Sequence, residues 1–314
     1  MTSFLLRRLG FLLLTLLLTS ATIFVVTQLL PGDIARIVLG REASEAAMQA
    51  LRRELGLDRP PLIQYLQWLG GFIVGDWGTS FSTGQPIREL VLERLGNSMM
   101  LAGMTLAIAV PAAVALGVVA ALHAHKPLDG VISIGSLAVV GLPEFVTGLV
   151  LIQLLAFELR LFPASSSIRP DAGFLEAAPM LVLPALTATL VLLAYITRLT
   201  RASVLEELHK PYVRTAILKG IGRRRVTYRH VLGNALLPTI TVIAISFGWL
   251  ISGLIVVENV FNYPGLGSLL TFAIDRRDIP LLQAITMVAV VAFALANLVA
   301  DLLYGYLDPR IRYG

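Results

Sequence analysis

Long apolar runs separated by polar segments dominate the sequence. A membrane-spanning helix needs about 20 mostly apolar residues, and six runs meet that requirement. They are Leu9–Leu30, Ser98–Leu122, Val131–Phe157, Ala177–Thr197, Leu236–Val257 and Leu281–Ala300. The pattern therefore predicts an all-α membrane protein with six transmembrane helices.

The composition fits a chain surrounded by lipid. Hydrophobic residues make up 56% of the 314 residues and charged residues 14%, whereas soluble domains average about 45–50% apolar and about 25% charged. A soluble core of this length could not bury so much apolar surface. The sequence contains no cysteine, which excludes disulfides and thiolate metal sites.

The distribution of basic residues predicts the orientation in the membrane. Six crossings place both termini on one side, where four segments hold 14 of the 25 lysines and arginines, while the two short loops opposite hold 4. The four segments are 1–8, 123–130, 198–235 and 301–314, and the two loops are 158–176 and 258–280. Because cytoplasmic loops carry the excess of positive charge, both termini are expected in the cytoplasm.

The first apolar run is expected to be a retained anchor helix. It follows Arg7 and Arg8, has 22 residues and ends in Leu29-Leu30-Pro31-Gly32-Asp33. A secretory signal peptide has a shorter apolar region, about 7–15 residues, and a small-residue cleavage site.

Residues 31–97 are then expected to form an extracytoplasmic segment with helices of its own. Ser44 fits the N-cap of one helix and Gly56 its end. Four residues between them would share an apolar face: Ala47, Met48, Leu51 and Leu55. Tyr65 and Trp68 follow in a second apolar-aromatic stretch. We interpret the segment as a cap packed on the outer face of the bundle; a docking surface for an external solute carrier is the alternative.

The sequence lacks a phosphate-binding loop for ATP. That loop requires a lysine preceded by glycine, but the three lysines follow His125, His209 and Leu218. If ATP drives this protein, another subunit must bind it.

The longest cytoplasmic loop contains a short helix with well-marked ends. Ser203-Val204-Leu205-Glu206 fits a capping box, Pro211 suits the first position of the following helix, and Gly220 suits its end. One face of that helix would carry Val213, Ala216, Ile217 and Gly220. An ordinary basic loop would explain the positive charge but not a helix with such ends, so the pattern favours a helix that docks on a partner.

A series of short motifs runs along almost the whole chain. It comprises Leu30-Pro31-Gly32-Asp33, Leu51–Asp58 with Gln64-Tyr65, Gly75–Ser80 with Gly84–Ile87, Tyr212–Ala216 with Lys219-Gly220, Arg229-His230, Asn234–Pro238, Glu258–Phe261 with Pro264–Gly267, Asp301–Tyr304 and Leu307–Tyr313. In this order the motifs resemble the permeases of binding-protein-dependent ABC transporters. The closer resemblance is to the dipeptide/oligopeptide/nickel branch, first-permease type.

The resemblance implies a non-catalytic permease subunit of the bacterial inner membrane that imports di- or oligopeptides. Its implied partners are a second homologous permease, two ABC ATPase subunits and an extracytoplasmic solute-binding protein. ATP and Mg²⁺ would belong to the ATPase subunits, and this chain would bind no cofactor, metal or nucleic acid. Nickel, glutathione-like and opine-like solutes stay open as cargo.

The resemblance also implies which residues couple the permease to the ATPase. They are Tyr212, Arg214, Thr215, Ala216, Lys219 and Gly220. Many ABC permeases open this motif with Glu-Ala-Ala, where this chain has Arg214-Thr215-Ala216. This branch commonly shows that substitution, so coupling is still expected.

Five residues are candidates for the translocation pathway or its outer gate. They are Glu144, Glu258, Pro264, Gly265 and Gly267. An acid at membrane depth hints at a pathway, and Glu144 could meet the amine of a peptide. A carboxyl group that is protonated in place or bonded to a neighbouring helix is an equal alternative.

Other functions fit the sequence less well. A free-standing secondary transporter or channel would need charges buried at the midplane, and Glu144 alone offers one. An intramembrane hydrolase would need a base in the bilayer, but the four histidines lie in or beside cytoplasmic segments. His123 and His125 lack a third local metal ligand, so a solvated loop is favoured there.

We expect three parts along the chain. An N-terminal helix with its extracytoplasmic segment occupies 1–95. The permease core, with the coupling loop 198–235, occupies 96–304. A cytoplasmic tail occupies 305–314.

Overall fold

The computed structural model describes residues 2–29, 36, 39, 43–54, 56–167 and 174–307. Within these residues the regular structure is helical, apart from an isolated β-bridge between Thr79 and Pro86. The predicted all-α fold class is thereby confirmed. The motif Leu30–Asp33, Leu55 of the predicted apolar face, and the closing residues from Asp308 onward lie outside the described residues.

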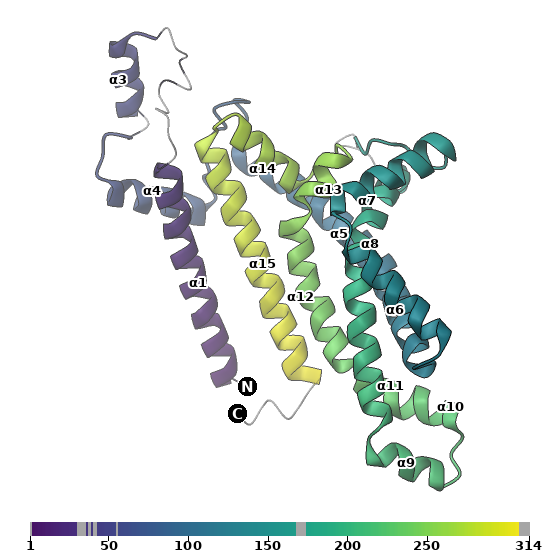
Figure 1. Ribbon diagram of the computed structural model, residues 1–314. Coiled ribbons are helices and arrows are strands. Elements are labelled where there is room, and N and C mark those ends of the chain that lie inside the picture. Colours follow the sequence, from purple (N-terminus) through teal and green to yellow (C-terminus); the bar gives the residue numbers. More distant parts are fainter. Residues whose placement is uncertain are drawn as a thin grey trace. The chain divides into compact units, whose positions relative to one another are not determined.

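The chain forms two compact units. One comprises Met1–Asn97 and Gly265–Ala294, and the other comprises Ser98–Pro264 and Leu295–Gly314. In chain order the helices are α1 (Thr2–Gln28), α3 (Glu45–Glu54), α4 (Pro61–Val74), α5 (Ile87–Leu122), α6 (Pro127–Val140), α7 (Glu144–Leu151), η1 (Ile152–Glu158), α8 (Phe174–Leu208), α9 (Pro211–Leu218), α10 (Arg223–Val226), η2 (Thr227–Val231), α11 (Leu232–Ala235), α12 (Leu237–Gly253), α13 (Ile255–Val260), α14 (Leu266–Asp275) and α15 (Ile279–Leu307) (Figure 1).

Four helices in the described part of the chain are by themselves long and apolar enough to cross a bilayer, namely α1, α5, α8 and α15. The number rises to six if each of two bent pairs counts as one span. One pair is α6 with α7 and η1, bent by 104°, and the other is α10–α11 with α12, bent by 46°. The predicted apolar runs coincide with these elements.

The third predicted span, Val131–Phe157, is divided into two helices. α6 ends at Val140, and α7 begins directly after Pro143. Proline has no N–H group and disfavours helical geometry at the residue before it. The break therefore falls at Gly141–Pro143, immediately before Glu144.

Local signals set the ends of α3 as the sequence predicted. The Ala47 N–H donates to Ser44 Oγ at 3.3 Å, and Gly56 follows the helix with a φ of +66°. Met48, on the predicted apolar face, is buried. The N-cap and the glycine stop are both confirmed.

Aromatic rings fasten α4 to α1 in the first unit. Phe24 of α1 contacts the rings of Tyr65 and Trp68, and Phe72 stacks on Trp77 at 5.0 Å. The hydroxyl groups of Ser20 and Tyr65 share a hydrogen bond of 2.9 Å. The aromatic residues Tyr65 and Trp68 thus pack on α1, which is long and apolar enough to span a bilayer.

A buried carboxylate fixes the turn after α4 to the start of α15. Asp278 Oδ2 accepts hydrogen bonds from the Ser80 hydroxyl at 2.6 Å and from the Ser82 N–H and hydroxyl at 2.9 and 2.6 Å. Its Oδ1 accepts the Leu281 N–H in the first turn of α15. Because a buried carboxylate is costly unless its oxygens are satisfied, these bonds specify the loop conformation.

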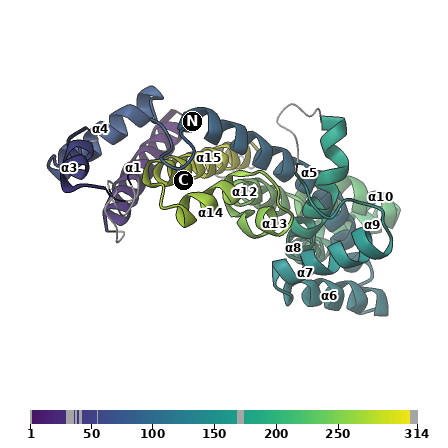
Figure 2. The same ribbon diagram turned by 90° about the horizontal axis from the view of Figure 1, so that it is seen from above.

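In the second unit, α6 and α7 pack along α8, and α13 lies beside α7 (Figure 1, Figure 2). α5 approaches α8 through small residues at four-residue spacing: Thr105, Ala109, Ala113 and Gly117. Side-chain hydroxyl groups of Thr189 and Thr197 donate to backbone carbonyls of α5 at 3.3 and 3.2 Å. Small residues let membrane helices approach closely, and such hydroxyl bonds hold them together.

We predict that Gly117→Ala destabilises the second unit. An added Cβ would lie 2.6 Å from the Thr200 Cβ and 2.7 Å from the Thr197 carbonyl oxygen, and overpacking costs about 1–3 kcal/mol. The thermal midpoint of the detergent-purified protein should fall. The control is Gly103→Ala on the same helix, where a new Cβ meets nothing within 4 Å. Equal midpoints for the two variants would contradict the close approach of α5 and α8.

Candidate functional site: helix α9

Helix α9 begins and ends at the residues that the sequence predicts. Pro211 is its first residue, after Lys210 in an extended conformation. At the other end Gly220 has a φ of +83°. The Gly220 N–H donates to the Ile217 carbonyl and the Ile221 N–H to the Ala216 carbonyl, at 2.9 and 3.2 Å. This pair of bonds is a Schellman motif, which needs a left-handed residue at that place, so both predicted ends are confirmed.

The predicted capping box at Ser203–Glu206 is wrong. α8 continues to Leu208, and Ser203 lies within it. The reason is packing, because Val204 is fully buried and Leu205 and Leu208 pack against the same apolar cluster. Burial of these side chains stabilises the helix beyond the local capping signal.

One face of α9 packs against the rest of the second unit. Val213 joins a buried cluster formed by the ends of α5 and α8 and by the α10–α11 segment. Its other buried members are Val118, Ala121, Val204, Val226, Val231 and Ala235. Ala216 packs against it, whereas Ile217 and Gly220, predicted on the same face, are exposed.

The opposite side of α9 is exposed and mixes apolar with basic groups. Leu218 is 78% exposed and Ile217 43%. Arg214, Thr215 and Lys219 are exposed around them. Ile217 and Leu218 are adjacent exposed apolar side chains with basic neighbours, a combination that a binding partner can cover.

A buried acid, Glu207, holds the start of α9 against α8. Its carboxylate accepts a hydrogen bond from the Tyr212 hydroxyl at 2.8 Å and forms an ion pair with Lys210. Burial and the bond to Glu207 raise the pKa of Tyr212, so its hydroxyl group remains a donor. The bond to Glu207 also raises the pKa of Lys210. Tyr212, predicted as a coupling residue, is 36% exposed and ties the start of α9 to α8.

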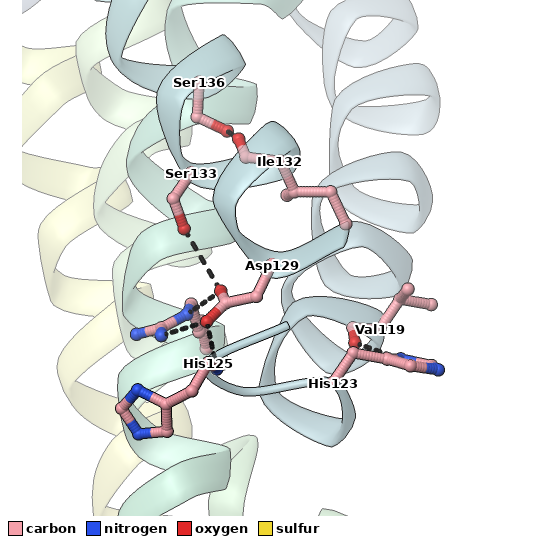
Figure 3. Close-up of polar contacts among 8 residues, drawn as sticks. Val119, His123, His125, Asp129, Ile132, Ser133 and Ser136 are labelled. Carbon is pink, nitrogen blue, oxygen red and sulfur yellow. Dashed lines mark hydrogen bonds and ion pairs between the residues drawn. The ribbon is translucent and has the colours of Figure 1, made fainter. Parts of the chain in front are cut away.

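A second ion pair joins α6 to α8 (Figure 3). Arg201 Nε and Nη2 donate to the two carboxylate oxygens of Asp129 at 2.5 and 2.6 Å. The same carboxylate accepts the His125 N–H at 3.0 Å and the Ser133 hydroxyl at 3.3 Å. Every lone-pair direction of this buried acid is thus used, and the planar guanidinium fixes its orientation.

His123 and His125 lie in the turn between α5 and α6. His125 has a φ of +63°, and His123 Nδ1 bonds to the Val119 carbonyl at 2.9 Å (Figure 3). Among the described residues no three His, Asp or Glu side chains form a group that could hold a metal ion.

The candidate pathway residues lie in different environments. Glu144 is the first residue of α7, and its Oε1 is buried without a hydrogen-bond partner among the described residues. Glu258 of α13 is 1% exposed and accepts the Ser98 hydroxyl at 2.6 Å. The helices that carry them are neighbours, since a Cβ on Gly148 of α7 would lie 3.2 Å from Val260. Glu258 thus belongs to a packed interior, and Glu144 stands at a break.

The remaining three candidates surround a turn. Pro264 follows Tyr263, whose N–H donates to the Glu258 carbonyl at 2.7 Å. Gly265 is the N-cap of α14 and Gly267 lies in its first turn, within the first unit.

Sequence reasoning missed the supports of the site: Asp129, Arg201, Glu207 and Ser98. Arg201 counted only as a positive charge in a cytoplasmic loop. Glu207 lies four residues before a helix-starting proline, and that position alone does not indicate burial. No signal in a single sequence pairs Asp129 with a residue 72 positions away.

Two family models match the chain. "Binding-protein-dependent transport system inner membrane component" matches residues 113–313, and "Binding-prot-dependent transport system membrane comp, N-term" matches residues 1–102. Among similar curated proteins is a "probable peptide ABC transporter permease protein" of Sinorhizobium fredii, 35% identical over 310 residues and 99% of each chain. An oligopeptide transport system permease protein of Bacillus subtilis is 35% identical over 92% of this chain and 93% of its own. A glutathione transport system permease protein of Escherichia coli K12 is 34% identical over the whole of both chains.

We predict that Glu207→Gln loosens α9 without unfolding the protein. Trypsin should cleave after Arg214 or Lys219 about tenfold faster, because a hydrogen bond to a charged group contributes about 1.5 kcal/mol or more and 1.4 kcal/mol is a factor of ten. Cleavage rates are followed by mass spectrometry of the purified protein. Glu206→Gln is the matched control, since Glu206 is the exposed neighbour. Identical cleavage of the two variants would show that Glu207 does not hold α9.

Proposed function

The chain belongs to the family of binding-protein-dependent transport system inner membrane components, and on that basis we propose that it is one of two membrane-spanning subunits of an ATP-driven peptide importer. It is a multi-pass inner-membrane permease without catalytic activity of its own. ATP and Mg²⁺ would be bound by two ATPase subunits on the cytoplasmic side. An extracytoplasmic binding protein would deliver the cargo.

The observation that carries this proposal is helix α9. A helix of eight residues is too short to be stable alone, yet its two ends and its buried side are fully specified. Its other side presents Leu218, Arg214 and Lys219 to the cytoplasm. We place the contact with an ATPase there, so that closure of the ATPases on ATP displaces α9 and the spanning helices behind it.

The cargo proposal rests on the relatives. Their names specify peptide, oligopeptide and glutathione transport, and all three cargoes contain amide-linked amino acids. Glu144, at a break in a membrane helix, could pair with a cationic amine of such a cargo. Glu258, Pro264, Gly265 and Gly267 would shape the outer gate.

The proposed division of the chain follows these roles. Residues 1–95 would anchor the chain and form its extracytoplasmic part. Residues 96–304 would form the translocation core with its coupling loop 198–235. Residues 305–314 would form a cytoplasmic tail.

The first test is purification of the tagged protein from its native membranes in mild detergent. A second six-helix permease and ATPases with phosphate-binding loops are expected by mass spectrometry. Leu218→Asp should release the ATPases and retain the second permease, because it places a charge at the exposed apolar centre of α9. Repeated recovery of the wild-type protein alone, even after crosslinking at residues 211–220, would refute the proposal and favour a secondary transporter that uses Glu144.

We further predict that Gly220→Pro uncouples ATP hydrolysis from uptake. Proline requires a φ near −65°, whereas Gly220 has +83°, and the substitution removes the N–H that closes the end of α9. Uptake of radiolabelled trialanine should be lost while the amount of protein in the membrane stays normal.

Gly222→Pro provides the control two residues further on. Gly222 has a φ of −56° and a ψ of 135°, which proline adopts without strain. Normal uptake is expected there. If Gly220→Pro transports as well as Gly222→Pro, the end of α9 has no part in coupling.

A further inference from the structure

The cytoplasmic part of α8 is attached to four neighbouring elements. Thr200 packs against Gly117 of α5, and its hydroxyl group lies 3.3 Å from that of Thr239 in α12. Glu207 holds α9 through Tyr212. Arg201, beside Thr200, holds α6 through Asp129. A displacement of α9 would therefore act on α8 as well as on the α10–α11 segment against which α9 packs.

The attachment of α6 to α8 combines close packing of the two helices with this ion pair. Asp129 and Ser136 are the buried residues of α6. Ile132 and Val139 are half-buried, whereas five other large apolar side chains are exposed in this chain: Leu128, Val131, Ile134, Leu137 and Val140. The Ser136 hydroxyl bonds to the Ile132 carbonyl of its own helix at 2.7 Å (Figure 3), and so does not fasten α6 to α8.

The ion pair has the geometry of a rigid joint. Two parallel N–H···O bonds hold the guanidinium and the carboxylate in one plane, which fixes orientation as well as distance. The His125 N–H and the Ser133 hydroxyl hold the same carboxylate from the α6 side. Rotation of α6 relative to α8 would break both bonds to Arg201 together.

α6 leads from this joint to the break in its span. It has 14 residues, which at 1.5 Å per residue gives a rod of about 21 Å. Asp129 lies at its first turn, and Gly141–Pro143 follow its last. Beyond the break stands Glu144, with its buried unpaired oxygen.

We propose that Asp129 and Arg201 are positioning residues for transport: their ion pair makes α6 follow α8 when α9 moves, and so carries the movement to the break before Glu144. The proposal rests on the proposed function, in which an ATPase moves α9. In this proposal both residues act through the position of α6.

The test measures the distance between α6 and α8 in the assembled transporter. Because the chain has no cysteine, Ile134→Cys and Ala202→Cys, both at exposed positions, can carry spin labels for double electron–electron resonance in nanodiscs. With the ion pair intact, a narrow distance distribution is expected both without nucleotide and with ATP and vanadate. Asp129→Asn and Arg201→Gln should broaden it, and Arg201→Lys should restore it in part.

The second readout is trialanine uptake per ATP hydrolysed in proteoliposomes. We expect the transporter that carries Asp129→Asn to hydrolyse ATP at the wild-type rate. Its uptake per ATP should fall roughly fivefold or more, the scale of an ordinary coupling between two sites. Ser136→Ala is the matched control, as the other buried residue of α6. A merely structural role would lower ATPase activity and uptake in proportion.

The outcomes separate this inference from the function on which it rests. If Asp129→Asn matches Ser136→Ala in both distance distribution and uptake per ATP, the positioning role is refuted. The proposed importer function is not affected by that result. If the wild-type protein binds no ATPase, the proposed importer function is refuted. The distances measured without nucleotide still show whether the ion pair fixes α6 to α8.

Discussion

Close backbone packing between α5 and α8 is the contact on which the second unit depends. Lipid provides no hydrophobic drive for helices to associate, so close contact and hydrogen bonds must hold them together. Small residues of α5 supply the contact, and the Thr189 and Thr197 hydroxyl groups supply the bonds. With α8 held along α5, its C-terminal end makes three further attachments, to α6, α9 and α12.

Features set by local backbone chemistry could be predicted from the sequence. The ends of α9 at Pro211 and Gly220, and those of α3 at Ser44 and Gly56, depend on a missing N–H, a left-handed φ or a hydroxyl cap. Each of these is a property of one or two residues. The apolar runs were equally clear, because a bilayer imposes a minimum length on any helix that crosses it.

Features that depend on distant neighbours could not be predicted in the same way. Pro143 breaks its span, whereas Pro111 and Pro184 lie inside continuous helices; the three residues look alike in sequence, and the packing around them decides. The capping box at Ser203 was overridden by burial of Val204. The sequence does not distinguish Asp129 and Glu207 from ordinary loop acids. Their contacts with Arg201 and Tyr212 depend on the fold.

The inner and outer sides of α9 have different roles, and this difference affects which substitutions the helix tolerates. Its ends are set by Pro211 and Gly220 and its inner side by Val213, so the outer positions take no part in folding the helix. Substitutions of exposed side chains such as Arg214 and Leu218 should therefore cost the fold little. If this side contacts an ATPase, as proposed, the choice of partner can change there while the helix itself is kept.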